Sequence, residues 1–443
     1  MNEASLVGTA GYRTDSYSAE PLRDIPVLSE SFSMLEEVPF RPTYRHAWPL
    51  IPGLGMFAAV AYLVGLIVQN NENVGLNHEQ YIDQNILAEQ CPSVAYPVPW
   101  KELNRKLHDC RRHEYYDPLH DICGVCPKPE PTDRVFAVYW ESQKDCARLV
   151  EEINTRYITH VYWAFATVNT NGEVSQSLQY WDDTAVMNCM ATLRMRCIKQ
   201  LVSIGGADCR NNFYSLKEPE AMTRFIDGAL SIVKRFDFDG IDIDDETGNQ
   251  KQANWDWNKN QGPTVISYLT KLRQSLDSMQ KPDEPRYLLT WDEFPSSFDH
   301  AIGGYAGCSF SAVNAGPNGD DGWHRCFSAG ITPLVDWVNI MLYNLPSAGD
   351  YSDTMNNRIP NWWVPTIPTN KLVIGACSGL GCVEPLPPSN QMYNAAYNGS
   401  VLYKGCMLWS ATFDILYESA NALKVMGSAG NYGVKMPFYT LDL

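Results

Sequence analysis

Residues 235–246 read RFDFDGIDIDDE, and this stretch decides both the fold and the chemistry expected of the chain. In a β-strand, side chains alternate between two faces, so Asp242, Asp244 and Glu246 would share one face. These three acids are called the acid strip below. Carboxylates a few ångströms apart resist joint ionisation, so they share protons and at least one pKa rises. Since such an arrangement is costly, it indicates a functional site.

The acid strip has two other possible interpretations. A solvated edge strand would carry surface acids, but Phe238, Ile241 and Ile243 are typical of a buried strand. A metal site would usually draw ligands from several elements and often include His, and no His lies near this stretch. The sequence therefore predicts neither a metal nor another cofactor.

Strands and helices alternate from Arg134 onward. Eight strands, mostly separated by helices such as 219–235 and 264–279, predict a (β/α)8 barrel, an α/β fold of the TIM type. The chemistry of such barrels lies at the C-terminal ends of the strands, and Glu246 follows the end of the fourth. The predicted strands are 135–140, 160–168, 199–205, 238–244, 286–292, 336–343, 371–377 and 405–411.

The overall charge excludes some classes of partner. The formal net charge is −17 and the pI is about 4.9, so the surface repels nucleic acid and anionic membrane faces. The chain also contains 13 Trp and 24 Tyr. Many of these aromatic residues must lie in the core, but their number also suits stacking on sugar rings.

An uncharged stretch near the N-terminus predicts a membrane anchor. Residues 47–69, AWPLIPGLGMFAAVAYLVGLIVQ, are long enough to cross a bilayer as a helix. Arg41 and Arg45 precede this stretch and the next basic residue is Lys101, which predicts a cytoplasmic N-terminus and a single-pass type II membrane protein. Residues 1–46 are expected to be a disordered cytoplasmic tail. A buried core helix and a cleaved signal peptide are the alternatives.

Cysteine usage agrees with that topology. All 13 Cys fall after the predicted anchor, beginning with Cys91, so disulfides are expected on the extracellular or luminal side. Residues 70–132 are expected to form a Cys-containing stalk ahead of a barrel domain at 133–443. The pair in Cys123-Gly-Val-Cys126 also suits a redox site or half a zinc site, although plain disulfides fit an oxidising compartment better. Asn398-Gly-Ser is the one glycosylation sequon beyond the anchor.

Four motifs of the barrel domain resemble those of glycoside hydrolase family 18. Residues 239–246 resemble the family's DxxDxDxE signature, and residues 203–206 resemble its SxGG motif on the third strand. Residues 341–344, MLYN, resemble the motif that ends the sixth strand, and residues 405–409 resemble the final strand with its Trp. The four motifs occur in the family's order, and the likeness covers the barrel domain alone.

The resemblance implies a role for each member of the acid strip. Glu246 would be the general acid that protonates the glycosidic oxygen and then the base that activates water. Asp244 would orient the substrate's acetamido group and stabilise the oxazolinium charge, and Asp242 would share a proton with Asp244. Tyr343 would hydrogen-bond the acetamido oxygen. Asp239 is three residues before Asp242, so in an alternating strand its side chain would point to the opposite face. It is therefore expected to be structural.

The resemblance also implies a set of sugar-binding residues. Trp409 would form the floor of the sugar pocket, and Asn344 stands where many family members have Asp. That substitution keeps a hydrogen-bonding group but removes a charge, which leaves open the pH profile and the substrate subclass. The predicted substrate-binding residues are Trp140, Phe165, Ser203, Gly205, Gly206, Asn344 and Trp409.

The predicted function is a membrane-anchored, chitinase-like hydrolase. It would cleave β-1,4 links after an N-acetylglucosamine with retention of configuration, with the substrate's own acetamido oxygen as nucleophile. An endo-β-N-acetylglucosaminidase acting on N-glycan cores is the first alternative. A non-catalytic chitin-binding lectin is the second, although such lectins usually lose the catalytic Glu. The expected partner is thus an N-acetylglucosamine polysaccharide or an N-glycan.

Overall fold

The computed structural model describes residues 109–130, 132–141, 144–179, 182–247, 260–298, 325, 327–344, 348–379 and 389–433. The predicted tail, the predicted anchor at 47–69 and the first part of the predicted stalk lie outside these residues. Within the described part of the chain, no helix is both long and apolar enough to cross a membrane. The anchor therefore stays a prediction.

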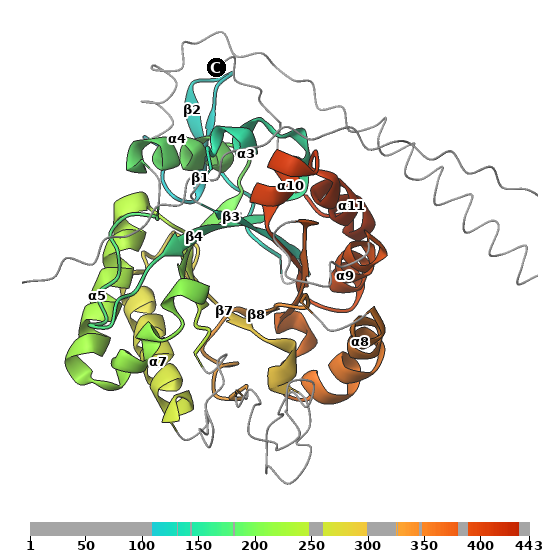
Figure 1. The fold of residues 1–443 in the computed structure, drawn as a ribbon. Helices are drawn as coiled ribbons and strands as arrows, with labels where there is room; N and C mark the ends of the chain where they lie inside the picture. Colours follow the sequence, from blue (N-terminus) through green and yellow to red (C-terminus); the bar gives the residue numbers. More distant parts are fainter. Residues whose placement is uncertain are drawn as a thin grey trace, which may run out of the picture. The chain divides into compact units, whose positions relative to one another are not determined.

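Eight parallel strands close into a barrel in the order β10-β3-β4-β5-β6-β7-β8-β9 (Figure 1). Each predicted strand corresponds to one of them, so the predicted (β/α)8 barrel is confirmed. The strands are β3 (Val135–Glu141), β4 (His160–Ala166), β5 (Lys199–Gly205), β6 (Gly240–Asp244), β7 (Leu288–Glu293), β8 (Trp337–Ile340), β9 (Leu372–Cys377) and β10 (Gly405–Trp409).

Helices surround the barrel strands (Figure 1). The longer ones are α4 (Asp183–Arg194), α5 (Pro219–Phe236), α7 (Gly262–Met279), α9 (Ser389–Val401) and α11 (Asn421–Gly430). Shorter ones are α3 (Ala147–Glu151), α8 (Ala348–Asp353), α10 (Ala411–Tyr417), the π-helix η6 (Thr354–Trp363) and the 3-10 helices η1 (Ile153–Tyr157), η2 (Ala207–Cys209), η3 (Asn212–Lys217), η4 (Pro295–Phe298) and η7 (Thr369–Lys371). A hairpin of β1 (Glu114–Asp117) and β2 (Ile122–Val125) precedes the barrel.

Helix α5 shows how local sequence sets an element's bounds. Pro219 occupies the first turn, where its missing N–H costs nothing. Lys234 and Arg235 lie in the last turn, where cations favour the helix dipole. Asp237 adopts a left-handed conformation and ends the helix directly ahead of the strand that carries the acid strip.

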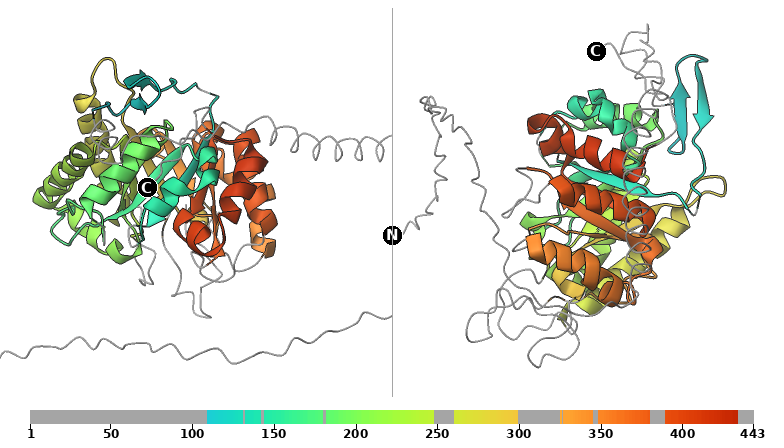
Figure 2. Two further views of the ribbon diagram at one scale, coloured as in Figure 1. Left: turned by 90° about the horizontal axis from the view of Figure 1, so that it is seen from above. Right: turned by 90° about the vertical axis from the view of Figure 1, so that its right-hand side faces the viewer.

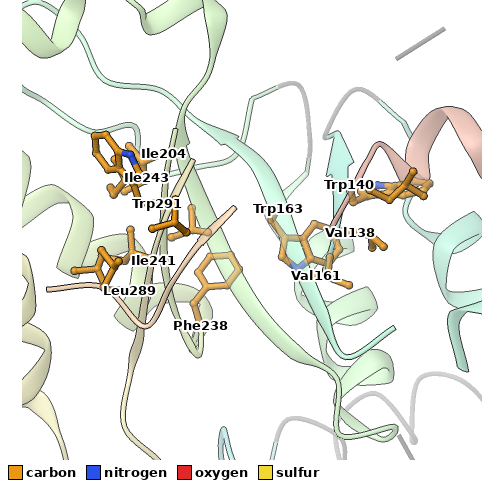
Figure 3. Close-up of a cluster of buried hydrophobic side chains, with 14 of the residues drawn as sticks. Val138, Trp140, Val161, Trp163, Ile204, Phe238, Ile241, Ile243, Leu289 and Trp291 are labelled. Carbon is orange, nitrogen blue, oxygen red and sulfur yellow. The ribbon is translucent and has the colours of Figure 1, made fainter. Parts of the chain in front are cut away.

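The barrel strands bury two separate apolar layers. One lies between the strands and the helices, where Ile241 and Ile243 pack in the same cluster as Trp291 (Figure 3). The other lies inside the barrel and includes Tyr139 and Tyr162. Because side chains alternate along a strand, the outward isoleucines turn the acids between them toward the barrel interior.

The hairpin is joined covalently to the barrel. Cys110 pairs with Cys123 within the segment, and Cys126 pairs with Cys197 just before β5. Both cysteines of the Cys123-Gly-Val-Cys126 motif are therefore in disulfides with other residues, which excludes the redox-pair and zinc-site interpretations. Residues 109–130, predicted as part of a stalk, belong instead to the folded domain.

Charged contacts place this segment at the end of the barrel where the strands begin (Figure 2). Arg112 donates to the carbonyl of Pro285, which precedes β7, and lies 3.6 Å from the carboxylate of Asp239, which precedes β6. Asp239 also accepts from the Gln200 backbone N–H at 2.8 Å and pairs with Lys199. Asp239 is thus structural, as its parity predicted.

Candidate active site

The acid strip runs along β6 and past its C-terminal end. Asp242 lies on the inner face with no exposed surface, while Asp244 is 6% and Glu246 9% exposed. Burial raises the pKa of Asp244 well above its usual value, and the negative charges of Glu246 and then Asp242 raise it further. The structure therefore brings the three predicted acids together.

Asp242 is surrounded by hydrogen-bond donors from four other strands. Its Oδ1 accepts from the Thr290 hydroxyl at 2.5 Å and from the Asn339 amide at 3.3 Å. Its Oδ2 accepts from the Ser203 hydroxyl at 2.8 Å and lies 2.9 Å from the Tyr139 hydroxyl. Burial raises the pKa of Asp242, but these hydrogen bonds oppose the effect because they favour the charged form.

Asp244 combines a closely packed backbone with a buried carboxylate oxygen that lacks a hydrogen-bond partner among the described residues. The backbone N–H of Gly206 donates to the Asp244 carbonyl at 3.0 Å. Gly205 has a φ of 128°, and a Cβ there would stand 2.1 Å from the same carbonyl oxygen. The absence of a side chain at Gly205 therefore allows this close backbone approach. Asp244 Oδ1 is buried without a hydrogen-bond partner among the described residues, so it can accept from a ligand.

Glu246 forms an ion pair with Arg210, a residue that the sequence analysis did not predict to lie in the site. Arg210 donates through Nε to Glu246 Oε2 at 3.0 Å, and its Nη2 contacts the same oxygen. Arg210 follows the third-strand motif by four residues, in the turn that carries η2. The side chain of Arg210 is 25% exposed, so this ion pair lies at the edge of the site.

Aromatic rings line the region beside the acids. Phe165, at the end of β4, stacks on Trp409, at the end of β10, with ring centroids 5.7 Å apart and planes at 27°. Tyr139 meets Trp409 edge to face at 5.3 Å. Tyr343 follows β8; burial raises its pKa well above the usual value, and the charges of Asp292 and Asp244 add to this effect. These four residues thus border the acid strip.

One predicted site residue points away from the acid strip. Trp140 has no exposed surface and packs in the outer layer with Val138 (Figure 3). Its Nε1 donates to the Lys144 carbonyl at 3.3 Å. The prediction for Trp140 was wrong because the preceding residue, Tyr139, takes the inward face of β3. Asn344 is exposed and adopts a left-handed conformation with φ 58°.

A buried arginine holds the loop that carries Glu246. Arg325 Nη1 donates to the backbone carbonyls of Asp245 and Thr247, on either side of Glu246. Arg325 Nε donates to Glu293 Oε1 at 2.7 Å. No periodicity or motif around Arg325 predicts this contact.

Among the described residues, no group of three or more His, Cys, Asp or Glu side chains is arranged to hold a metal ion. The acids of the strip instead contact hydroxyl groups, an amide and arginine. The arrangement can hold protons, accept hydrogen bonds from a ligand and present aromatic surface to it. It therefore suits general acid–base chemistry on a sugar.

Comparison with known proteins agrees with this arrangement. The family model described as "Glycosyl hydrolases family 18" matches residues 135–378. Chitinase A1 of Niallia circulans is 24% identical over 242 residues, which are 52% of this chain and 30% of that protein. Nod factor hydrolase protein 1 of Medicago truncatula is 25% identical over 49% of this chain and 51% of that protein. The chain thus spans about half or less of these relatives' length.

Solved structures share the fold. A chitinase from Cycas revoluta in complex with (GlcNAc)3 superposes with a TM-score of 0.51 at 16% identity, covering 67% of this chain and 99% of that one. A class V chitinase from Nicotiana tobaccum gives a TM-score of 0.50 at 14% identity, covering 68% of this chain and 100% of that one. The family model covers more than half of the chain and includes the acid strip, so the chain belongs to family 18 of the glycosyl hydrolases.

Proposed function

We propose that this protein hydrolyses β-1,4-linked N-acetylglucosamine glycans and that the anomeric configuration is retained. The observation that carries the proposal is the acid strip itself. Glu246 lies at the C-terminal end of the barrel, two residues beyond Asp244, whose Oδ1 is free to accept a hydrogen bond from a ligand. The stacked rings of Phe165 and Trp409 offer a surface for a sugar beside these acids.

The proposed mechanism uses the substrate's acetamido oxygen as the nucleophile, as is known for this family. Glu246 protonates the glycosidic oxygen and later removes a proton from the incoming water. Asp244 accepts from the acetamido N–H, and its negative charge stabilises the cyclic cation that forms. For this role Asp244 must ionise, and Asp242 is the neighbouring carboxyl able to take up its proton.

Arg210 adds a condition to this mechanism. In the structure, Glu246 Oε2 accepts from the guanidinium of Arg210, which is the arrangement of an ionised carboxylate. A general acid must carry a proton, and a nearby guanidinium favours the ionised form, so we expect Arg210 to move away from Oε2 before Glu246 acts. Because Arg210 is partly exposed, a bound sugar is able to displace it.

We propose a chitin-type substrate rather than an N-glycan, and the names of the relatives support this choice. The relatives are named as chitinases and as a Nod factor hydrolase, and a structure of the same fold holds (GlcNAc)3. The protein should therefore shorten chitooligosaccharides. Release of the glycan from a high-mannose glycopeptide would instead assign the N-glycan activity.

The variant Glu246→Gln tests the assignment of the acid. It keeps the size and hydrogen-bonding capacity of the side chain but cannot transfer a proton. Turnover of a chitooligosaccharide should fall on the order of 10²–10⁴-fold while the oligosaccharide still binds. Turnover is measured by chromatography of the products, and their anomeric configuration is read by NMR immediately after cleavage.

Three outcomes would contradict parts of the proposal. Near-wild-type turnover of Glu246→Gln would place the general acid at another residue. Binding of chitooligosaccharide by the wild-type protein, without cleavage of it or of the glycopeptide, would favour the lectin alternative. An initial product of inverted configuration would exclude the substrate-assisted mechanism.

A further inference from the structure

A fourth carboxyl lies inside the barrel, and the mechanism above gives it no task. Asp292 is on the inner face of β7 and is 2% exposed. Its Oδ2 lies 2.6 Å from the Tyr139 hydroxyl, while its Oδ1 has no hydrogen-bond partner within the described part of the chain. The same hydroxyl lies 2.9 Å from Asp242 Oδ2. Tyr139 thus stands between Asp292 and the acid strip.

Tyr139 forms a bridge between Asp242 and Asp292, and the number of available protons limits which hydrogen bonds this bridge can contain. A tyrosine hydroxyl has one proton to donate, so it cannot donate to both carboxyl groups at once. If both carboxyls were ionised, one oxygen would face the hydroxyl oxygen of Tyr139 without a proton between them. The two short distances therefore require Asp242 or Asp292 to be protonated and to donate to Tyr139.

The surroundings of the two carboxyls show which one holds the proton. Asp242 has donors on both oxygens, including Ser203 and Thr290, which suits an ionised carboxylate. Asp292 has fewer donors, the Tyr139 hydroxyl at Oδ2 and the Asn339 amide, and its Oδ1 is unpaired, which would be costly for a buried anion. Burial raises the pKa of Asp292 well above its usual value, and the charges of Asp242 and Asp244 raise it further.

We infer that Asp292 is a positioning residue for the acid strip: as a protonated carboxyl it donates to Tyr139 and thereby directs the Tyr139 proton onto Asp242. This inference rests on the proposed function, because its effect is to keep Asp242 ionised and ready to receive the proton of Asp244. The titratable or charged groups around the bridge are Tyr139 on β3, Tyr162 on β4, Asp242 and Asp244 on β6, Glu246 beyond it, Tyr343 after β8, and the guanidinium groups of Arg210 and Arg325.

Substitutions at Asp292 distinguish this role from simple packing. Asp292→Asn keeps a donor for Tyr139 and mimics the protonated acid, so kcat on a chitooligosaccharide should stay within about threefold of wild type. Asp292→Leu has a similar size but no donor, so kcat should fall on the order of 10–100-fold with KM little changed. Tyr139→Phe should lose a similar factor, and combining it with Asp292→Leu should add little.

Asp414→Asn is the matched control. Asp414 is another buried carboxyl, and it accepts from the backbone N–H groups of Ala422 and Leu423 at the start of α11, away from Tyr139 and Asp292. Its substitution should leave the pH profile of kcat unchanged. Equal losses of kcat in Asp292→Asn and Asp292→Leu, or unchanged kcat in both, would overturn the inference.

Thermal unfolding supplies a readout that needs no substrate. A carboxyl that stays protonated in the folded state makes wild-type stability fall as pH rises above about 4, where the unfolded chain ionises. Asp292→Asn removes this effect, so its Tm should rise relative to wild type between pH 4 and pH 8. A constant Tm difference over that range would mean that Asp292 is ionised, which overturns the inference. If the Tm difference rises but wild type cleaves nothing, the proposed function fails while the protonation of Asp292 stands.

Discussion

At the scale of one residue, ionisation of the Asp244 carboxyl affects both the stability of the protein and its catalysis. It is buried beside Glu246 and Asp242, and burial together with their charges raises its pKa well above the usual value. Ionising Asp244 in the empty site is therefore unfavourable, yet the proposed mechanism requires that ionisation against the substrate's developing cation. A substrate that supplies an N–H and then a positive charge would lower this penalty.

The variant Asp244→Asn should thus raise stability and lower activity. For wild type, the raised pKa of Asp244 means that stability is lost as pH rises above about 4, toward the folded-state pKa. Asn does not ionise, so at pH 7 the variant should have a higher free energy of unfolding than wild type. Denaturant titration at pH 4 and pH 7 measures this gain, which should appear only at the higher pH.

Turnover of the same variant should fall, and the acidic limb of its pH profile should shift, because the charge facing the oxazolinium ion is gone. Asp414→Asn again serves as the control for loss of a buried carboxyl away from the strip. A variant with reduced stability at pH 7 and normal turnover would contradict the role given to Asp244.

At the scale of elements, two strands fix the loop that presents Glu246. Strand β6 ends at Asp244, and β7 ends at Glu293, which is fully buried. Glu293 accepts from Arg325, and Arg325 donates to the carbonyls of Asp245 and Thr247. The position of Glu246 is therefore set by a buried ion pair between β7 and a residue far along the chain.

Glu293→Gln should destabilise the protein without removing the catalytic acid. The substitution removes the carboxylate that accepts from Arg325 and leaves Asp245 as a charged neighbour of this buried guanidinium, so the free energy of unfolding should fall by up to about 3–5 kcal/mol. Well below the melting temperature, kcat should stay within about tenfold of wild type. Glu151→Gln, at the exposed end of α3, is the matched control and should change neither quantity.

The measurements are thermal unfolding and turnover on the same samples. A loss of turnover as large as that of Glu246→Gln, with unchanged stability, would instead make Glu293 a candidate for the general acid. The contacts of Glu293 with Arg325, Trp291 and Ser297 make that result unexpected.

Elements were easier to predict from the sequence than the contacts between them. All eight barrel strands were predicted, because each is a short apolar run and the acid strip gave the parity of β6. Strand β3 contains no acid that would identify its inner face from the sequence. The prediction therefore placed Trp140 in the site, whereas Tyr139 is the residue that faces the barrel interior. Arg210 and Arg325 reach the site from loops, whose paths neither periodicity nor composition predicts.

At the scale of the whole molecule, disulfides tie the barrel to the segment before it. Cys126–Cys197 closes a loop of 71 residues, and Cys146–Cys189 joins α3 to α4. The predicted disulfides are thus confirmed, while the described cysteines also include two free, buried thiols, Cys209 and Cys406. The hairpin lies at the end of the barrel opposite the acid strip, where its disulfide to the barrel is expected to stabilise the fold.

Removing the Cys126–Cys197 disulfide should lower the stability of the fold and leave turnover unchanged. The paired substitution Cys126→Ser and Cys197→Ser should lower the free energy of unfolding by about 2–4 kcal/mol, since the unfolded chain gains freedom. Turnover per folded molecule should not change. Cys406→Ala, which removes a cysteine that forms no disulfide, is the control for the loss of a thiol. A selective loss of turnover would mean that the hairpin influences the acid strip across the barrel.

The disulfides also bear on where the protein resides. Bonds of this kind persist in oxidising compartments, which is where the barrel would lie if residues 47–69 cross a membrane with Arg41 and Arg45 on the cytoplasmic side. We propose this type II topology. The sequon at Asn398 lies within α9 with its side chain half-buried, so a vacant sequon would not contradict it.

A pair of reporters tests the topology in intact cells. A reporter fused before residue 1 should be protected from added protease, because the positive charges of Arg41 and Arg45 hold that side in the cytoplasm. A reporter fused after residue 443 should be accessible at the cell surface or within the lumen. Replacing Arg41 and Arg45 by Glu should increase the fraction with the opposite orientation, while replacing Lys101, beyond the span, should not. Full-length protein that is free in the cytosol, with its cysteines reduced, would contradict both the anchor and the placement of the barrel.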